Sequence, residues 1–268
     1  MPGADLVITT ISMVFAIDFY PCPMHEVATL SAALAALSAP IDSFAEWFIS
    51  TAQFYAIVDQ AAARTIGHCA IHESMGLTRF YVDPAERRHG QPLFRQVRKQ
   101  FAVTQAMVPT CDEFFLSHAL DEYAELHKQA YFFGVGAPNG VWDDLAGLYF
   151  QPATLADLAE TAAINGDFLD QLEERISAGE IHIGRYEGVV VAMGIIERGQ
   201  LLPDYGSIGM LVVPEQRQRG IGARMLRYLR HVCEMQQIHP IAGCGYDNLL
   251  SKRTLEAAGM VTATRLYG

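Results

Sequence analysis

The chain has 268 residues, of which 51% are hydrophobic and 18% are charged, and its formal net charge is -11. This length and composition predict a globular protein with a sizeable core, built as one large domain or two ordinary ones, and they exclude a disordered chain. The acidic balance opposes binding to a polyanion wherever a local basic patch is lacking, so nucleic acid is not an expected partner.

The cysteines and the N-terminal segment indicate the compartment. The five cysteines are scattered and form no CxxC pair, which indicates reduced thiols in a cytoplasmic protein. The apolar stretch 6–20 carries Asp18, is too short to span a bilayer and follows no basic segment, so neither a signal peptide nor a membrane anchor is predicted. On a regular strand His68 and His72 share a side that Cys69 does not, so no metal site is expected there.

The first half is predicted to contain helices, then three strands, then a helix. Residues 24–50 are rich in Ala and Leu and predict a pair of helices interrupted at Pro40. Strands are predicted at 54–58, 66–71 and 77–82, and a helix over 92–101.

The second half repeats this order. Its predicted elements are helices over 155–164 and 168–176, a hairpin of strands 181–186 and 189–197, a strand over 207–213 and a helix over 222–236. A strand at 241–246, a helix that begins after Asn248 and ends before Gly259, and a strand-like run at 261–266 follow.

A short motif recurs between the halves. Residues 82–90 (VDPAERRHG) align with residues 212–220 (VVPEQRQRG) at a constant offset of 130, so that the Pro, the first Arg and the Gly coincide. Together with the repeated order of elements, this predicts an internal duplication. Turn residues gather at 134–140, which predicts a boundary between the halves near 134–146.

The turn after Pro214 has the features of a phosphate-binding site. A strand, a glycine-containing turn and a helix present free backbone N–H groups at the positive end of a helix dipole, and Gly220 and Gly222 have no Cβ to hinder an approaching pyrophosphate. Five arginines form a local basic patch suited to a multiphosphate ligand, Arg217, Arg219, Arg224, Arg227 and Arg230. The alternative is a solvated basic helix face. A dinucleotide site is disfavoured because the third small residue of GxGxxG is absent.

Residues 212–222 (VVPEQRQRGIG) resemble the pyrophosphate motif of the GNAT superfamily of N-acetyltransferases, V-x-P-x-x-[QR]-x-x-G-x-[GA], and residues 248–260 resemble its second block, N-x-x-[AS] followed by G-[FM]. The resemblance implies an α/β fold of two tandem GNAT-like domains, each a mixed, mostly antiparallel sheet flanked by helices. Residues 1–140 form the degenerate domain, which is not expected to bind CoA, because Pro92 stands in the place of Gly222 without an N–H and 121–133 has no matching Asn or Gly. Residues 146–268 form the acyl-CoA-binding domain.

The resemblance implies acetyl-CoA as co-substrate and no metal. The implied binding residues are Met210, Leu211 and Val212 for the pantetheine arm and thioester carbonyl, Gln218, Arg219, Gly220, Ile221, Gly222 and Ala223 for the pyrophosphate with Arg217 beside them, and Asn248 for the pantetheine. Asn248 is also a good helix N-cap, and the two roles are compatible.

The implied chemistry is direct attack of an amine on an acyl thioester, without a covalent enzyme nucleophile. The acid and base that many family members use correspond to Leu255 and Ser207 in this chain, so both are missing. The remaining candidates lie at strand ends or in loops expected to face the acceptor: Glu197 and Tyr205, which we select, and Asp204 and His182. The expected acceptor is a primary amine of a small molecule or peptide, and the expected state is a monomer or homodimer without a membrane partner.

Two other classes of function remain open. A non-catalytic acyl-CoA-binding or regulatory protein would explain the missing acid and base, and an assembly protein would not be stabilised by acetyl-CoA at all. Finally, the family usually adds a strand beyond 261–266, and we hypothesise that the apolar segment 6–19 supplies it.

Overall fold

The computed structural model describes residues 16–136 and 145–268. The first half contains the strands β1 (Ile17–Cys22), β2 (Gln53–Asp59), β3 (Arg64–His72), β4 (Gly76–Val82), β5 (Val108–Pro109) and β6 (Lys128–Val135). Its helices are α1 (Leu30–Ala35), α2 (Ser43–Ser50), α3 (Gly90–Gln100) and α4 (Glu113–Leu120), with short turns η1 (Met24–Glu26) and η2 (Pro84–His89). The predicted helix pair, three strands and helix are all present, whereas β5, α4 and β6 have no counterpart among the predictions.

The second half contains the strands β7 (Leu148–Pro152), β8 (Ile181–Tyr186), β9 (Val189–Arg198), β10 (Tyr205–Val212), β11 (His239–Gly245) and β12 (Met260–Tyr267). Its helices are α5 (Leu158–Asn165), α6 (Leu172–Ser177), α7 (Ile221–Met235) and α8 (Leu249–Ala257), with turns η3 (Leu155–Asp157) and η4 (Pro214–Gln216). Every element predicted for this half is present to within a few residues, and only β7 is additional.

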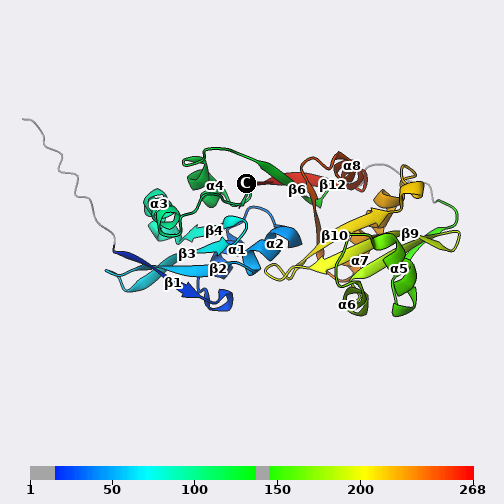
Figure 1. Cartoon of the computed structure of the whole chain (residues 1–268), viewed down its shortest axis with the longest axis horizontal. Helices are drawn as coiled ribbons and strands as arrows, with labels where there is room; N and C mark the ends of the chain where they lie inside the picture. The colour runs from blue at the N-terminus through cyan, green and yellow to red at the C-terminus, as the bar shows by residue number, and fades with distance from the viewer. Residues whose placement is uncertain (1–15, 137–144) are drawn as a thin grey trace, which may run out of the picture.

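The strands form a four-stranded sheet, β1-β2-β3-β4, and an eight-stranded sheet, β5-β12-β6-β11-β10-β9-β8-β7, both flanked by helices (Figure 1). The strand pairs are antiparallel except for β10 with β11. A parallel bridge between Leu77 and Ala106 connects the small sheet to the segment that leads into β5. The predicted fold class, two repeats of a mixed and mostly antiparallel sheet flanked by helices, is therefore confirmed.

The two halves exchange their last strands. β6 comes from the first half but pairs with β11 and β12 of the second, and β12 in turn pairs with β5 of the first. The central strand order is β5-β12-β6-β11. Exchanging each strand for its counterpart, β5 with β11 and β6 with β12, gives the same order read backwards, so the strand pairing has the symmetry of the duplication. Figure 1 shows β6 and β12 in the middle of the molecule, between the strands of the two halves.

The hypothesis that segment 6–19 supplies the strand beside 261–266 is wrong for the part of the segment that the structure describes. Residues 17–19 belong to β1, which pairs with β2 in the small sheet, and residues 6–15 lie outside the described residues. The neighbours of β12 are β6 and β5. An apolar run shows that a segment can form a strand, but it does not show which sheet edge the strand will join.

The strand β6 is buried on both faces. Phe132 packs with Phe54 and Leu266 in a core that belongs mainly to the first half, whereas Phe133 packs with Leu226 in the core of the second half. Successive side chains of a strand point to opposite faces, so one strand serves both cores. The division of the sequence into 1–140 and 146–268 stays a prediction; the sheets are not divided there, because β6 lies within the second sheet.

We predict that Phe133→Ala destabilises the whole chain. The side chain is 2% exposed, so its removal leaves a cavity that costs ~3–5 kcal/mol in the free energy of unfolding. Urea denaturation followed by circular dichroism measures this loss. Val135→Ala, on the same strand at a side chain that is 52% exposed, is the matched control and should change the free energy by less than about 0.5 kcal/mol. Equal effects of the two variants would contradict the shared core.

Candidate functional site

The turn between β10 and α7 has the local structure that the sequence predicts. Gly220 is the N-cap of α7 and has φ +75°, a left-handed conformation that favours glycine. The Arg224 N–H donates to the Gly220 carbonyl oxygen at 3.1 Å, which begins the backbone bonding of the helix. The N–H groups of residues 221–223 therefore precede the first helical bond and lie at the positive end of the helix dipole.

Two arginines hold the turn in place. Arg217 Nε donates to the Val212 carbonyl oxygen at 3.0 Å and ties the turn back to β10. The guanidinium of Arg219 lies 4.5 Å from the centroid of the Tyr186 ring. Both arginines are exposed, so their remaining donors are accessible from solvent.

The basic patch is smaller than predicted. Arg230 is buried, and its Nη1 donates to the Ala258 carbonyl oxygen at 2.6 Å at the end of α8, so it does not belong to the patch. Burial lowers the pKa of Arg227, and the neighbouring charges of Arg230 and Arg224 lower it further. The excess of positive charge at the start of α7 stabilises an anion that binds there.

A gap opens between β10 and β11 next to this turn. The two strands pair only from Tyr205 to Ser207 on β10, whereas β11 pairs with β6 from Ala242 to Gly245. Residues 209–211 are consequently half-buried, although β10 lies between two strands of the sheet. The strands diverge, and the inner edge of β10 is left open.

Backbone donors of β10 point into this gap. The Val213 N–H donates to the Val191 carbonyl oxygen at 3.0 Å, towards β9. Because successive backbone groups of a strand point to alternate sides, the N–H groups of Met210 and Val212 point away from β9, into the gap, and that of Leu211 points to β9. Of the three main-chain groups predicted to bind the pantetheine arm, two therefore face the gap.

Glycines form one face of the gap. Ser207 pairs with Ile241, so Gly209 and Gly243 lie level with each other, two residues further along, on the same face of the sheet. A Cβ on Gly245 would meet open space. This face is therefore open beside Gly245, whereas Asp42 fills the space beside Gly243, and Ile195 and Phe168 lie beside Gly209.

The opposite face is packed. A Cβ on Gly222 would lie 3.0 Å from Met210 Sδ and 3.1 Å from Thr254 Cγ2, so the absence of a side chain there lets α7 pack on β10 and α8. Leu255, in the position of the missing acid, is 4% exposed within the core. Neither of these positions faces the gap.

The first half closes the narrow end of the gap. The Ser43 N–H, at the start of α2, donates to Ser207 Oγ at 2.8 Å. Asp42 is the N-cap of α2: its Oδ1 accepts from the Ala45 N–H at 3.0 Å, and a Cβ on Gly243 would overlap its Oδ2. The end of α2 therefore lies on the glycine face, against both diverging strands.

A second carboxylate fixes α2 to the second half. Glu46 is 3% exposed and accepts backbone N–H groups from three consecutive residues of the β9–β10 hairpin at 2.6, 3.2 and 3.1 Å, those of Gln200, Leu201 and Leu202. Buried polar groups that are satisfied in this way fix one arrangement of the parts they join. This contact holds Asp42 in register with the gap.

Sequence reasoning missed Asp42 and Glu46. Burial raises the pKa of the Asp42 carboxyl from its ordinary value of 3.8 to about 6; the Ala45 N–H lowers it, and the charges of Glu46 and Glu197 raise it. An Asp before a helix is an ordinary capping signal. Nothing in the local sequence could show that this cap faces a strand more than 150 residues away.

Two of the four predicted acid and base candidates lie on the glycine face. Glu197 pairs with Ser207 and lies on the glycine face, where its Oε1 accepts from Arg175 Nη1 at 3.2 Å. Tyr205 lies on the same face, towards the closed end of the gap, beside the ring of His239. Glu197 and Tyr205 are therefore near the gap.

The other two candidates lie elsewhere. His182 is buried beneath α7, with its Nδ1 3.2 Å from the Tyr228 hydroxyl oxygen, and burial lowers its pKa to about 4. Asp204 is exposed just before β10, where its carbonyl oxygen accepts from the His239 N–H at 2.8 Å.

The matching turn of the first half is covered. Arg87 Nε donates to the Val82 carbonyl oxygen at 3.5 Å, the same contact as Arg217 with Val212 at the offset of 130. Gly90, however, is the first residue of α3 with φ -52°, and a Cβ there would overlap the imidazole of His118 on α4. The space beside this turn is filled by protein.

A buried ion pair crosses from β4 to α4. Arg79 is 1% exposed, and its Nη1 donates to Oδ2 of Asp112, the N-cap of α4, at 3.0 Å. Asp112 corresponds by its place in the fold to Asn248, the N-cap of α8, so the expectation that the counterpart of the second block lies around 121–133 is wrong. The ion pair joins β4 to α4. The counterparts of these elements in the second half, β10 and α8, are separated by the open gap.

We predict that Asn248→Ala removes a helix cap. The side-chain oxygen of Asn248 accepts from the Ser251 N–H at 3.1 Å, which confirms the capping role, and its loss should cost about 1 kcal/mol in the free energy of unfolding. Asn248→Asp keeps an acceptor at the cap and serves as the control. Thermal denaturation of both variants checks this; an Asp variant as unstable as the Ala variant would contradict it.

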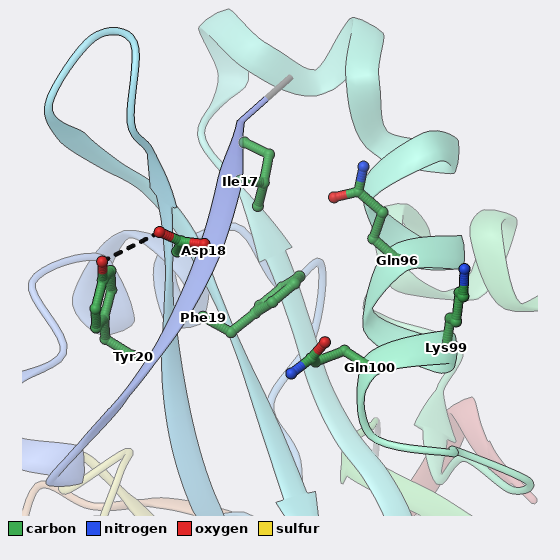
Figure 2. A pocket seen from close by; sticks show the side chains of 7 residues that line it. All are labelled: Ile17, Asp18, Phe19, Tyr20, Gln96, Lys99 and Gln100. Carbon is green, nitrogen blue, oxygen red and sulfur yellow. Dashed lines mark hydrogen bonds between the residues drawn. The ribbon is translucent and has the colours of Figure 1, made fainter. Parts of the chain in front are cut away.

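One cavity lies in the first half, and another is lined by the first half together with Tyr267 and Gly268. One, of about 590 Å³, lies between β1 and α3, where Phe19 points towards the side of α3 that carries Gln96 and Gln100 (Figure 2). The other, of about 440 Å³, lies beside β5 and α4. Neither is lined by a residue of the β10–α7 turn, so neither belongs to the gap.

Several further features concern the described part of the chain. No group of three or more His, Cys, Asp or Glu within residues 16–136 and 145–268 is arranged to hold a metal ion. None of the helices in these ranges is long and apolar enough to cross a membrane. All five cysteines lie within the ranges and are free thiols.

Comparison with known proteins assigns the fold. The model described as the Acetyltransferase (GNAT) domain matches residues 25–135, and that described as the Acetyltransferase (GNAT) family matches residues 142–260. No curated protein matches the chain significantly.

Solved structures agree. A GNAT-family acetyltransferase from Colwellia psychrerythraea is 18% identical with a TM-score of 0.80, over 94% of this chain and 98% of that one. A GCN5-related N-acetyltransferase from Sphaerobacter thermophilus is 11% identical with a TM-score of 0.62, over 94% of each chain. A tandem GNAT protein from the clavulanic acid biosynthesis pathway is 13% identical with a TM-score of 0.57, over 94% of this chain and 97% of that one. At these identities the similarity shows the fold alone.

The matches define the class of the protein, an acyltransferase. More narrowly, the chain belongs to the GNAT superfamily and contains two GNAT domains in tandem.

Proposed function

We propose that this protein is an N-acetyltransferase that transfers the acetyl group of acetyl-CoA to a primary amine of a small molecule or peptide, by direct attack. The observation that carries the proposal is the gap between β10 and β11, into which the N–H groups of Met210 and Val212 point, next to the N-terminus of α7. Membership of the family supports acyl transfer in general. The donor, the acceptor and the residues that bind them are part of the proposal.

The donor would lie along the open edge of β10. The N–H groups of residues 218–223, with Arg217 and Arg219 beside them, would bind the pyrophosphate. The pantetheine arm would follow residues 210–212 towards Asn248. The Met210 N–H would then donate to the thioester oxygen, where negative charge develops during attack.

The amine would approach from the glycine face. A Cβ on Gly245 would meet open space on this face, whereas the opposite face is filled by Met210 and α8. The acidic groups at this face, Asp42 and Glu197, favour a cationic acceptor. The covered turn at Gly90 and the Arg79–Asp112 ion pair support one donor site, in the second half.

We predict that the double variant Arg219→Ala with Arg224→Ala binds acetyl-CoA about 10- to 100-fold more weakly, because each charge-assisted hydrogen bond to a phosphate contributes ~1.5–3 kcal/mol and the two are partly redundant. Isothermal titration calorimetry measures the Kd. Arg88→Ala, an exposed arginine on the turn of the first half, is the matched control and should leave the Kd unchanged. Equal weakening by both variants would place the donor elsewhere.

We predict that acetyl-CoA raises the melting temperature of the protein, since a ligand that binds only the folded state stabilises it, and that a primary amine elicits release of free CoA thiol. A thiol reagent follows the release across a panel of polyamines, aminoglycosides and peptide N-termini. Stabilisation without thiol release from any amine would favour the non-catalytic acyl-CoA-binding or regulatory protein. Absence of stabilisation at millimolar acetyl-CoA would favour an assembly role.

A further inference from the structure

We propose that Asp42, which belongs to the first half, is the catalytic base of the acyl transfer in the second half. The inference rests on the proposed function and adds to it the group that removes the proton from the acceptor amine. It would explain why the first half is retained although its own turn is covered.

The position of Asp42 supports this role. Its Oδ1 accepts the N–H of the helix cap, and its Oδ2 fills the space beside Gly243, two residues along β11 from the open space at Gly245. Asp42 itself is 6% exposed, but Gly243 is an exposed residue, so the carboxylate lies at the edge of an accessible space. Gly243 is level with Gly209, one residue from the Met210 N–H on β10.

The other carboxylates near the gap already have strong partners. Glu46 accepts three backbone N–H groups, and Glu197 is paired with Arg175. Both carboxylates therefore already hold hydrogen-bond donors, and neither is the one that lies against Gly243. Asp42, by contrast, accepts from the Ala45 N–H through Oδ1, which leaves Oδ2 to the glycine face.

The charges around Asp42 favour proton uptake near neutral pH. The titratable groups that face it are Glu46 on α2, Glu197 on β9 with its partner Arg175, and the thiol of Cys244 on β11. Burial and the two glutamates raise the pKa of Asp42 to about 6. A base with a pKa slightly below the working pH is ionised and still basic enough to accept a proton.

The step balances as follows. The amine nitrogen forms the new carbon–nitrogen bond, and the carbon–sulfur bond breaks with its electron pair going to sulfur. The proton that the attacking nitrogen loses passes to Asp42 Oδ2, directly or through one water, and from there to solvent. The CoA thiolate takes a proton from solvent.

The variant Asp42→Asn tests the inference, because Asn also caps a helix and the change removes only the charge. We measure kcat at saturating acetyl-CoA from pH 5 to 9 with an amine that the wild type acetylates. The wild-type rate should rise through pH 6 as Asp42 ionises. The variant should be about 10²- to 10⁴-fold slower and lack this rise, with an unchanged Kd for acetyl-CoA.

Glu197→Gln is the matched comparison. Its charge raises the pKa of Asp42, so its removal should move the rise in rate to lower pH without abolishing it. The proposal would be overturned if the rise in kcat with pH survived in Asp42→Asn, or if it disappeared only in Glu197→Gln. Either result would leave acetyl transfer itself intact. A wild type that releases no thiol with any amine would reject the proposed function and the base with it.

Stability gives a readout that does not depend on turnover. Because burial raises the pKa of Asp42 in the folded state above its unfolded value, the protonated form favours folding, and this contribution is present at pH 4 and lost as the pH rises through 6. The melting temperature of Asp42→Asn should therefore rise relative to that of the wild type over this interval. A difference that is independent of pH would contradict the perturbed carboxylate.

Discussion

The structure depends on the insertion of β6 between β11 and β12. A strand needs partners for the backbone groups of both its edges, and β11 finds only a short stretch of pairing with β10. β6 supplies the other edge of β11 and the inner edge of β12, and its two phenylalanines enter separate cores. The same pairing holds β11 away from β10. The gap therefore exists because a strand of the first half supports the second.

The proposed site is composite for the same reason. Its strands, its N–H donors and its basic turn come from the second half, whereas the carboxylate at its closed end comes from α2 of the first. Asp42 of α2 fills the space beside Gly243, and the space beside Gly245 on the same face is open. The Glu46 contact with the β9–β10 hairpin fixes this arrangement, because three backbone N–H groups would otherwise lose their acceptor. A single repeat could not provide such a site.

The duplicated halves have diverged in a physically simple way. Both keep the contact of an arginine with a strand carbonyl, at Arg87 and Arg217. In the first half the position of the second-half cap, Asn248, is occupied by Asp112, and Arg79 reaches it across the fold. His118 fills the space beside Gly90. Replacing an open edge with buried packing removes a ligand site without changing the order of the elements.

The sequence by itself determined the local elements, the duplication and the turn at Arg217 to Gly222, because hydrophobic period, glycine, proline and capping residues act within a few residues of each other. It also selected Glu197 as a candidate expected to face the acceptor, and the structure places this residue beside the gap. Only the tertiary structure decided the partner of β6 and the place of Asp42, since strand pairing and the docking of α2 join segments far apart in the chain. A cap residue becomes a candidate base through its distant neighbours, and these leave no local pattern in the sequence.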